Sequence, residues 1–356
     1  MRIRIFFCFE KEYNINVVTI YDLAKITGFS APTVSKALNG TGKLSEETRQ
    51  KILEAAKQAN YNANMAARAL TTKRTKLIGI ILEDVTQMGG FEHPLFGGVL
   101  NKFRSEMDIA GYDIIFLSKA LNKTMSYTDH CNYRNVEGVL IMNPPPGDEE
   151  IKNFADSGIP CVSTNEIIKG VCSIVTENTE AGKQACSEFI KAGHKRIGFI
   201  GPEFTEASPA SLERHNGYKL ALEESGIEYD KSLVEICDYW DSESGYKAAK
   251  KLIERCPDVT AVFAANDTVA FGIMRAAYEL GKKMPQDLSL IGFDDDRMSR
   301  FANPALSTFK QDRERIAELA AECLLQSIAG IPKPEVVRVP AEFVRRDSVC
   351  QRNENE

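Results

Sequence analysis

The chain has 356 residues, a length that exceeds one ordinary hydrophobic core and favours two or three folding units. Apolar residues make up 43% and charged residues 26% of it, a balance that argues against disorder and against a membrane span. The net charge of −6 is unevenly distributed: residues 1–76 hold 13 basic against 6 acidic residues, and the other 280 hold 31 against 44. The amino-terminal part is therefore suited to a polyanion, although a short segment can also be basic by chance.

Residues 1–17 contain only a short apolar run, which Glu10 and Lys11 interrupt. A secretory signal needs a longer run, of roughly 7–15 apolar residues, so we expect no export and a cytoplasmic location. We predict that this segment is a disordered arm or results from a misassigned start codon.

The nine cysteines are scattered and form no C-x-x-C pair, which predicts reduced thiols without a disulfide framework or a metal site. The motifs GxxxxGK, HExxH and GxSxG do not occur. The sequence therefore predicts a protein without cofactors that is not an enzyme.

Residues 18–62 begin with the pattern of a short helix. Thr19 is a suitable N-cap for the segment IYDLAKIT, and Gly28 is a suitable end for it. The apolar residues of this segment recur at helical spacing: Ile20, Leu23, Ala24 and Ile26.

Two further short helices follow. Ser30 can cap the segment APTVSKALN, in which Pro32 stands early enough to be tolerated. After Ser45, the segment EETRQKILEAAKQAN supplies apolar residues that can cover the first two helices. Two short helices joined by a glycine-containing turn predict a helix-turn-helix.

The residues from 18 to 72 resemble the headpiece of the lactose and galactose repressor (LacI/GalR) family. The resemblance lies in TIYDLAKITGFSAPTVSKALNG, LSEETRQKILEAAKQANYNAN and MAARAL. It implies a DNA-binding transcriptional regulator whose second helix enters the major groove.

The resemblance gives base-reading roles to Ala31, Pro32 and Lys36. Lys36 can donate hydrogen bonds to guanine, whereas the other two offer apolar contact to a thymine methyl group. Tyr21 either binds a phosphate or packs against the third helix. The complete predicted DNA-binding set is Thr19, Tyr21, Ser30, Ala31, Pro32, Thr33, Ser35, Lys36, Asn39, Asn64, Arg68 and Leu70.

Residues 63–76 resemble the hinge of the family, a segment that is disordered alone and helical on operator DNA. Leu70 aligns with the leucine that wedges between base steps from the minor groove, and Arg68 lies beside it. The alternative for Leu70 is a buried linker residue. The family often has proline where this chain has Ala63.

From Leu77 onward, short apolar runs alternate with amphipathic stretches. A first set of strands is predicted in LIGIIL, YDIIFL, VEGVLIM and IPCVST, with helices near 95–110, 124–134 and 148–157. A second set of strands is predicted in CSIV, RIGFIG, LVEIC, AVFAAN and LSLIGFD. This alternation predicts an α/β body of two parallel-sheet lobes, with a ligand beyond the carboxyl ends of the strands.

Polar and aromatic residues stand where that ligand is expected. Asn165, Asn266 and Asp294 each follow a predicted strand, and Trp240, the only tryptophan, follows LVEIC. Arg214 lies in the amphipathic segment LERHNGYKLAL. Carboxylate, amide and guanidinium groups bind hydroxyl pairs and an indole stacks on a sugar ring, so this set favours a sugar or nucleoside site over a catalytic one.

Residues 77–348 resemble the periplasmic-binding-protein-like (type I) sensor domain of the same family, through AGHKRIGFIG, FAANDTVAFGIMRA, DLSLIGFDD and PALSTFKQD. The resemblance implies an effector set of His93, Phe96, Asn165, Arg214, Trp240, Asn266 and Asp294, in which Asn165 is the weaker candidate.

Several of these positions have an alternative interpretation. Phe96 can be a core residue, and Arg214 can form a surface ion pair. Asp267 and Asp295, which follow the same strands, can cap turns in place of contacting a ligand.

The expected organisation follows from these segments. The body divides into a first lobe, residues 77–164 and 309–335, and a second lobe, residues 165–308 and 336–348, before a tail at 349–356. The chain departs from the family at Glu177, where an aspartate is usual, and in a short polar segment before the third strand.

We therefore expect a repressor that binds a pseudo-palindromic double-stranded operator as a homodimer under the control of a small carbohydrate effector. One alternative is a catabolite-control-type regulator whose corepressor is a phosphorylated carrier protein. A solute-binding protein is a further alternative, but it would need an export signal and would not use residues 18–72.

Overall fold

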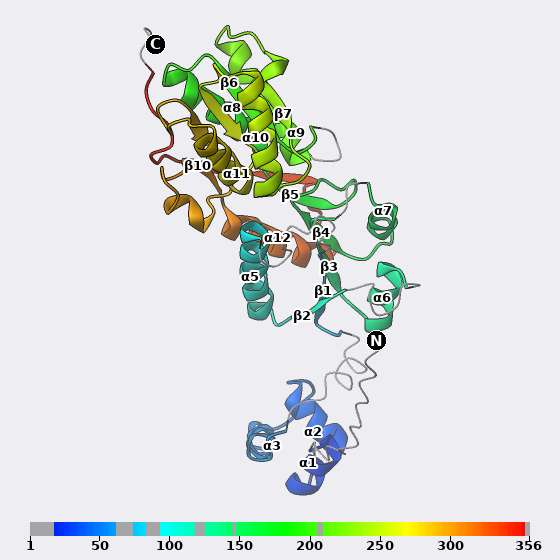
Figure 1. Cartoon of the computed structure of the whole chain (residues 1–356). Coiled ribbons are helices and arrows are strands. Elements are labelled where there is room, and N and C mark those ends of the chain that lie inside the picture. Colours follow the sequence, from blue (N-terminus) through cyan, green and yellow to red (C-terminus); the bar gives the residue numbers. More distant parts are fainter. Residues whose placement is uncertain are drawn as a thin grey trace, which may run out of the picture. The chain divides into compact units, whose positions relative to one another are not determined.

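The computed structural model describes residues 18–61, 74–82, 93–117, 125–144, 147–204 and 209–352. They belong to two compact units, Met1–Thr75 and Lys76–Glu356, each described here by itself (Figure 1). The predicted arm at 1–17 and most of the predicted hinge, with Asn64, Arg68 and Leu70, lie outside the described residues.

The first unit is a bundle of the three predicted helices, α1 (Ile20–Thr27), α2 (Ala31–Leu38) and α3 (Glu46–Gln58). Thr19, Ser30 and Ser45 are their N-caps, and Gly28 ends α1 in the left-handed conformation. The small core contains one or two residues from each helix, namely Leu23, Val34, Ala37, Ile52 and Ala56.

Ile26 of α1 does not belong to this core, because its side chain is 61% exposed. The buried residue one turn after Leu23 is Thr27, whose hydroxyl donates to the Leu23 carbonyl oxygen at 2.7 Å. A threonine can therefore face the core, because its hydroxyl is satisfied within the helix.

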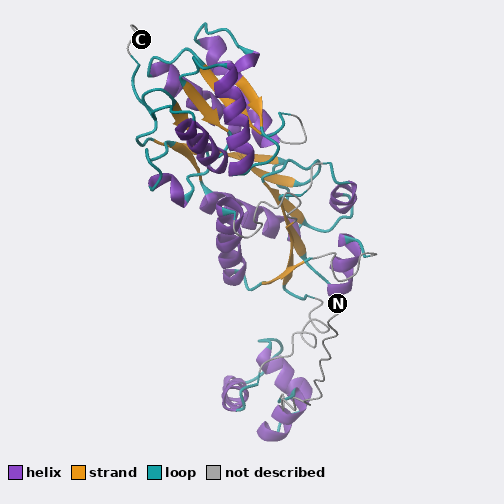
Figure 2. Ribbon diagram, in the orientation of Figure 1, coloured by secondary structure: helices purple, strands orange, loops and turns teal. Residues whose placement is uncertain are grey.

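The second unit contains a six-stranded parallel sheet with helices on both faces. Its elements are β1 (Leu77–Leu82), α5 (Pro94–Ile109), β2 (Asp113–Phe116), α6 (Tyr127–Arg134), β3 (Gly138–Met142), α7 (Glu149–Ala155), β4 (Cys161–Thr164), β5 (Cys172–Thr176), α12 (Arg313–Ile328) and β11 (Val336–Val339). The strand order is β11-β5-β4-β3-β1-β2. Helices α5 and α12 cover one face and α6 and α7 the other, so the strands alternate between two cores (Figure 2).

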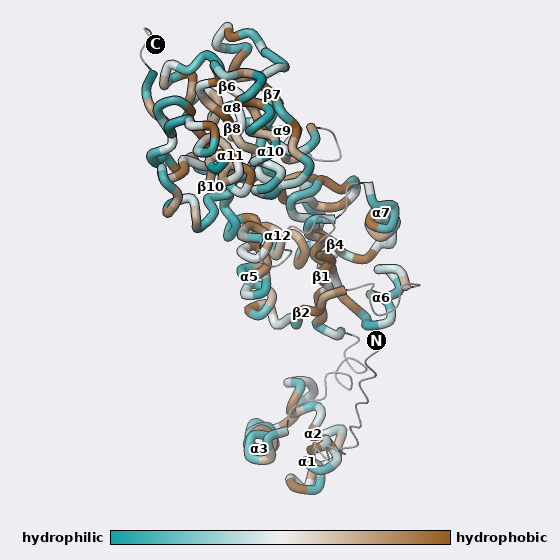
Figure 3. The backbone as a smooth tube through the Cα atoms, viewed as in Figure 1, coloured by the Kyte–Doolittle hydropathy of each residue, from teal (hydrophilic) through white to brown (hydrophobic). Residues whose placement is uncertain are grey.

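A second parallel sheet, of four strands, forms the core of the other lobe. Its elements are β6 (Ile197–Gly201), β7 (Val234–Ile236), β8 (Ala261–Ala264), β9 (Ser289–Ile291), α8 (Asn178–Lys191), α9 (Pro209–Glu224), α10 (Ser242–Arg255) and α11 (Asp267–Glu279). The strand order is β7-β6-β8-β9, with α8 and α9 on one face and α10 and α11 on the other. Figure 3 shows hydrophobic residues gathered in the strands and a mixture of hydrophilic and hydrophobic residues along the helices.

The described chain passes between the lobes at three places: after β5, between β10 (Thr308–Gln311) and α12, and between β11 and β12 (Ala341–Val344). Strands β10 and β12 form an antiparallel pair. Ser307, which directly precedes β10, forms an isolated β-bridge with Ile291 of β9, so the pair lies beside the second sheet.

The predicted lobe boundaries are wrong in three segments. Strands β5 and β11, assigned to the second lobe, pair with each other in the first sheet, whereas residues 309–311, assigned to the first lobe, lie in β10. The error at β5 has a physical reason, which is the short link between β4 and β5. Parallel neighbours ordinarily need a crossover of about a dozen residues or more, yet only residues 165–171 join these two.

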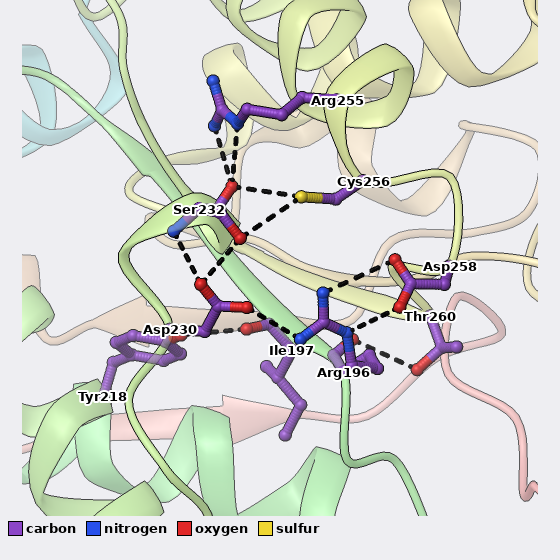
Figure 4. Close-up of polar contacts among 9 residues, drawn as sticks. All are labelled: Arg196, Ile197, Tyr218, Asp230, Ser232, Arg255, Cys256, Asp258 and Thr260. Carbon is purple, nitrogen blue, oxygen red and sulfur yellow. Dashed lines mark hydrogen bonds and ion pairs between the residues drawn. The ribbon is translucent and has the colours of Figure 1, made fainter.

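A polar cluster stabilises the amino ends of β6, β7 and β8 (Figure 4). Arg196 donates to Asp230 at 2.8 Å and lies 2.9 Å from a carboxylate oxygen of Asp258. Asp230 also accepts from the Ser232 amide and hydroxyl, and hydrogen bonds from Ser232 and Arg196 lower its pKa to about 2. Hydrogen bonds and ion pairs among these side chains therefore hold the amino ends of the three strands together.

No helix among the described residues is both long and apolar enough to cross a bilayer. The eight cysteines within those ranges are free thiols.

Candidate ligand cleft and DNA-binding headpiece

Helix α2 and its two cap residues carry most of the predicted DNA contacts. Pro32, Lys36 and Asn39 are exposed, and Ala31, Thr33 and Ser35 are half-buried. Ser30 caps the helix by accepting a hydrogen bond from the Thr33 amide, and α2 contains no acidic residue. Its positive helix end and Lys36 therefore face solvent without a competing carboxylate of the same helix, which suits a phosphate backbone.

At the start of α1, Tyr21 is 70% exposed, so the alternative that it packs against α3 is wrong. Thr19 donates to the Asp22 carboxylate at 2.6 Å and accepts from its amide at 3.3 Å, forming a capping box. Tyr21 is thus available to a phosphate, whereas the Thr19 hydroxyl already serves the helix.

In the second unit, Arg214 lies at the centre of the predicted ligand site. Its side chain is only 3% exposed, so the surface ion-pair alternative is wrong. Its Nε donates to Asn178 Oδ1 at 2.9 Å and its Nη1 donates to the Ala265 carbonyl oxygen at 2.6 Å. Within the described residues Nη2 has no hydrogen-bond partner, so this buried cation retains a donor for a ligand.

Close helix packing holds Arg214 in place. At Gly182 of α8 a Cβ atom would lie 2.3 Å from the Arg214 carbonyl oxygen, so only glycine permits this approach of α8 and α9. The guanidinium lies 3.6 Å from the centre of the Phe293 ring. Burial lowers the pKa of Arg214 to about 10, and Asp294 opposes the shift, so the side chain stays charged at neutral pH.

Asp294 follows β9 with a φ of +108°, a backbone conformation that is strained for a residue with a side chain. Gln311, at the end of β10, donates to its Oδ1 at 2.6 Å, and Thr176, at the end of β5, donates to Gln311 Oε1. Sequence reasoning missed Gln311, which is 2% exposed. Its place near the end of the string PALSTFKQD could have indicated that it belongs to the site.

Trp240 and Asn266 lie beside Arg214. The Trp240 ring centre is 5.7 Å from the Arg214 guanidinium carbon, and its carbonyl oxygen accepts from Asn266 Nδ2 at 3.2 Å. Asn266 is also the N-cap of α11, accepting from the Val269 amide at 2.8 Å. The Asn266 amide is therefore largely occupied by the protein, while the half-buried indole offers a face to a ligand.

The first lobe contributes the facing wall. His93 caps α5 by accepting from the Leu95 amide at Nδ1, and its ring centre lies 4.6 Å from that of Phe96. Burial lowers the pKa of His93, and the negative charges of Asp294 and Asp296 in the other lobe offset only part of this shift. Phe96 belongs to the first core, as its alternative interpretation proposed, and also lines a pocket.

The pocket lies where the chain passes between the lobes and is lined by Leu95, Phe96, Val99, Thr164, Asn165, Ile174, Thr176, Gln311 and Ile316. Asn165 has a φ of +75° at the end of β4. The neighbouring Thr164 hydroxyl is buried and has no partner within the described residues. Sequence reasoning missed Thr164, because nothing in a strand-end threonine reveals that its hydroxyl is unpaired.

Asp267 and Asp295 have structural partners, as the turn-capping interpretation proposed. Asp267 accepts hydrogen bonds from the hydroxyls of Ser299 and Thr308, both at 2.6 Å, and from the Asp296 amide at 2.8 Å. Asp295 pairs with Arg346. These bonds fix the turn after β9 that carries Asp294. No set of three His, Cys, Asp or Glu side chains suited to a metal ion occurs in the described residues.

Comparison with known proteins agrees with this arrangement. Residues 19–64 match bacterial regulatory proteins of the lacI family, and residues 186–349 match the periplasmic binding protein-like domain. The two matches define a helix-turn-helix transcriptional regulator with a ligand-binding body. The probable HTH-type transcriptional repressor ExuR of Bacillus subtilis (strain 168) is 32% identical over 337 residues, which cover 94% of this chain and 98% of ExuR.

Solved structures show the same fold. The complex of the transcriptional regulator CelR with cellobiose matches with a TM-score of 0.70 and 26% identity, over 93% of this chain and 99% of CelR. The lac repressor dimer bound to operator and the anti-inducer ONPF matches with a TM-score of 0.79 and 24% identity, over 94% and 99%. The chain belongs to the lacI family of bacterial regulatory proteins, which confirms the resemblance and the predicted fold class.

Proposed function

We propose that this chain is a repressor that binds a pseudo-palindromic operator as a homodimer and releases or retains it in response to a carbohydrate bound between the lobes. The ligand class rests on Arg214, a buried cation beside Asp294 and Trp240 whose Nη2 has no hydrogen-bond partner within the described residues. A carboxylate and a guanidinium bind neighbouring hydroxyls, and an indole face stacks on the C–H face of a sugar ring.

The relatives support the same proposal. ExuR carries the name of a repressor, and CelR has been solved with cellobiose. In the headpiece, the start of α2 reads bases while Tyr21 and Ser30 contact phosphates, and Leu70 and Arg68 of the hinge contact the minor groove. Ligand affinity and operator affinity are then thermodynamically linked.

A thermal-shift screen of neutral sugars, uronic acids and nucleosides, followed by calorimetry on the best compound, tests the ligand class. We expect a sugar to bind, and Asp294→Ala and Arg214→Ala to abolish that binding while operator affinity without ligand stays near that of the wild type. Asp108→Asn, on the exposed surface of α5, is the matched control. Sugar binding that survives in both cleft variants would contradict the assignment of the cleft.

A further inference from the structure

An ion pair joins the two lobes of the second unit. Arg338, in β11 of the first sheet, donates from Nη2 to Glu213 Oε1 at 2.8 Å and from Nη1 to Oε2 at 3.1 Å. Glu213 lies in α9 of the other lobe. Two parallel bonds between a guanidinium and a carboxylate fix both distance and orientation. The pair therefore spans the two lobes close to the place where the chain crosses at Pro340.

The same carboxylate continues into the ligand cleft. Glu213 Oε2 accepts from Asn178 Nδ2 at 3.2 Å, and Asn178 Oδ1 accepts from Arg214 Nε at 2.9 Å. Asn178 also donates to the Thr176 carbonyl oxygen at 3.2 Å, at the end of β5. One chain of hydrogen bonds therefore links β11 in the first lobe to the buried arginine of the cleft.

Further carboxyl groups lie beside the ion pair of Arg338 and Glu213. Glu177 Oε2 lies 3.7 Å from Arg338 Nε. Glu166, in the short β4–β5 link of the first lobe, has its pKa raised to about 7 by burial and by the charge of Glu213. Without Arg338, carboxylates from both lobes would face each other and favour separation of the lobes.

We propose that Arg338 and Glu213 form an inter-lobe clamp, which holds the lobes in the arrangement of this structure and, through Asn178, orients Arg214 toward the ligand. These three residues are positioning residues that act on the ligand through Arg214. A regulatory role of the clamp rests on the proposed function. Its effect on the arrangement of the lobes does not, because that effect requires no bound ligand.

Trp240 allows a direct test, because it is the only tryptophan and its ring centre lies 5.7 Å from the Arg214 guanidinium carbon. Acrylamide quenching of its fluorescence in the full-length protein measures how open the cleft is. The side chains of Arg338 and Glu213 are 35% and 20% exposed. Because a half-exposed pair shifts a two-state balance by about fivefold at most, we expect Arg338→Met and Glu213→Gln each to raise the quenching constant roughly twofold.

Lys102→Met is the matched control. Lys102 pairs with Glu318 at 3.1 Å with similar exposure, but both residues lie in the first lobe, so the quenching constant should not change. Equal quenching in the wild type, Arg338→Met and Glu213→Gln would overturn the clamp, and so would an equal rise in Lys102→Met.

A charge swap separates the clamp from a general loss of stability. Arg338→Glu should raise quenching and increase the radius of gyration in small-angle scattering, and the double variant Arg338→Glu/Glu213→Arg should restore both toward the wild type. A double variant no better than Arg338→Glu would contradict the proposal. Neither readout uses sugar or DNA, so a protein that binds no sugar can still show the clamp, and a sugar-binding protein can lack it.

Discussion

Burial shifts the ionisation of individual side chains around the cleft. It lowers the pKa of Arg214 to about 10 and also lowers that of His93, while it raises the pKa of Glu166 to about 7. The guanidinium of Arg214 therefore stays charged at neutral pH. Asp294 was predictable from its place after a strand and Arg214 from the family resemblance, but the pKa shift of Glu166 was not, because it includes the charge of Glu213 in the other lobe.

The raised pKa of Glu166 predicts a pH-dependent stability. Below its ordinary pKa of 4.5 the carboxyl is protonated in both the folded and the unfolded chain, so its pKa shift does not change the free energy of unfolding. As pH rises from 4.5 to 7, the unfolded chain releases the proton while the folded protein retains it, so the free energy of unfolding falls; above 7 the loss is constant.

Glu166→Gln removes this loss. We expect the free energy of unfolding of the variant, relative to wild type, to increase between pH 4.5 and 7 by about 3 kcal/mol at most. Urea unfolding at a series of pH values measures the difference. A difference that is the same at pH 4.5 and pH 8 would show that Glu166 ionises normally in the folded state.

Local signals determined how well each element could be predicted. The three headpiece helices were predictable because Thr19, Ser30 and Ser45 cap them within the same segments. The place of β5 was not, because a parallel strand after the link at 165–171 lacks the usual helical crossover. The hydrogen bonds of Gln311 and the unpaired hydroxyl of Thr164 also depend on contacts between distant elements.

The polar cluster at the amino ends of β6, β7 and β8 makes a prediction for these elements. Hydrogen bonds from Ser232 and Arg196 lower the pKa of Asp230 to about 2, from 3.8. The stabilisation is present above pH 3.8 and is lost as pH falls through 2. Asp230→Asn should therefore lower the Tm at pH 7 but not at pH 2.

Differential scanning calorimetry at both pH values checks this prediction. Asp108→Asn is the control, because Asp108 is 60% exposed and lies 4.0 Å from Arg104, a geometry that contributes little to stability. An unchanged Tm for Asp230→Asn at pH 7 would mean that the cluster does not stabilise these strands.

For the whole molecule, the sequence was sufficient for the class of protein, because the headpiece pattern matches the lacI family and the body pattern matches the periplasmic binding protein-like domain. The charge distribution agrees, with a basic amino-terminal part and an acidic body. The sequence did not determine the ligand, since the same residues line the cleft whichever hydroxylated compound binds. The proposed function therefore depends on whether the cleft controls DNA binding.

The most direct test measures both activities on one protein. An operator is selected from a random duplex library with the full-length chain, and its affinity is measured with and without the compound found by thermal shift, for the wild type and Asp294→Ala. We predict a pseudo-palindromic operator whose affinity the compound changes about tenfold or more in the wild type and leaves unchanged in the variant. Selection of no common sequence, or an affinity that the compound leaves unchanged in the wild type, would contradict the account.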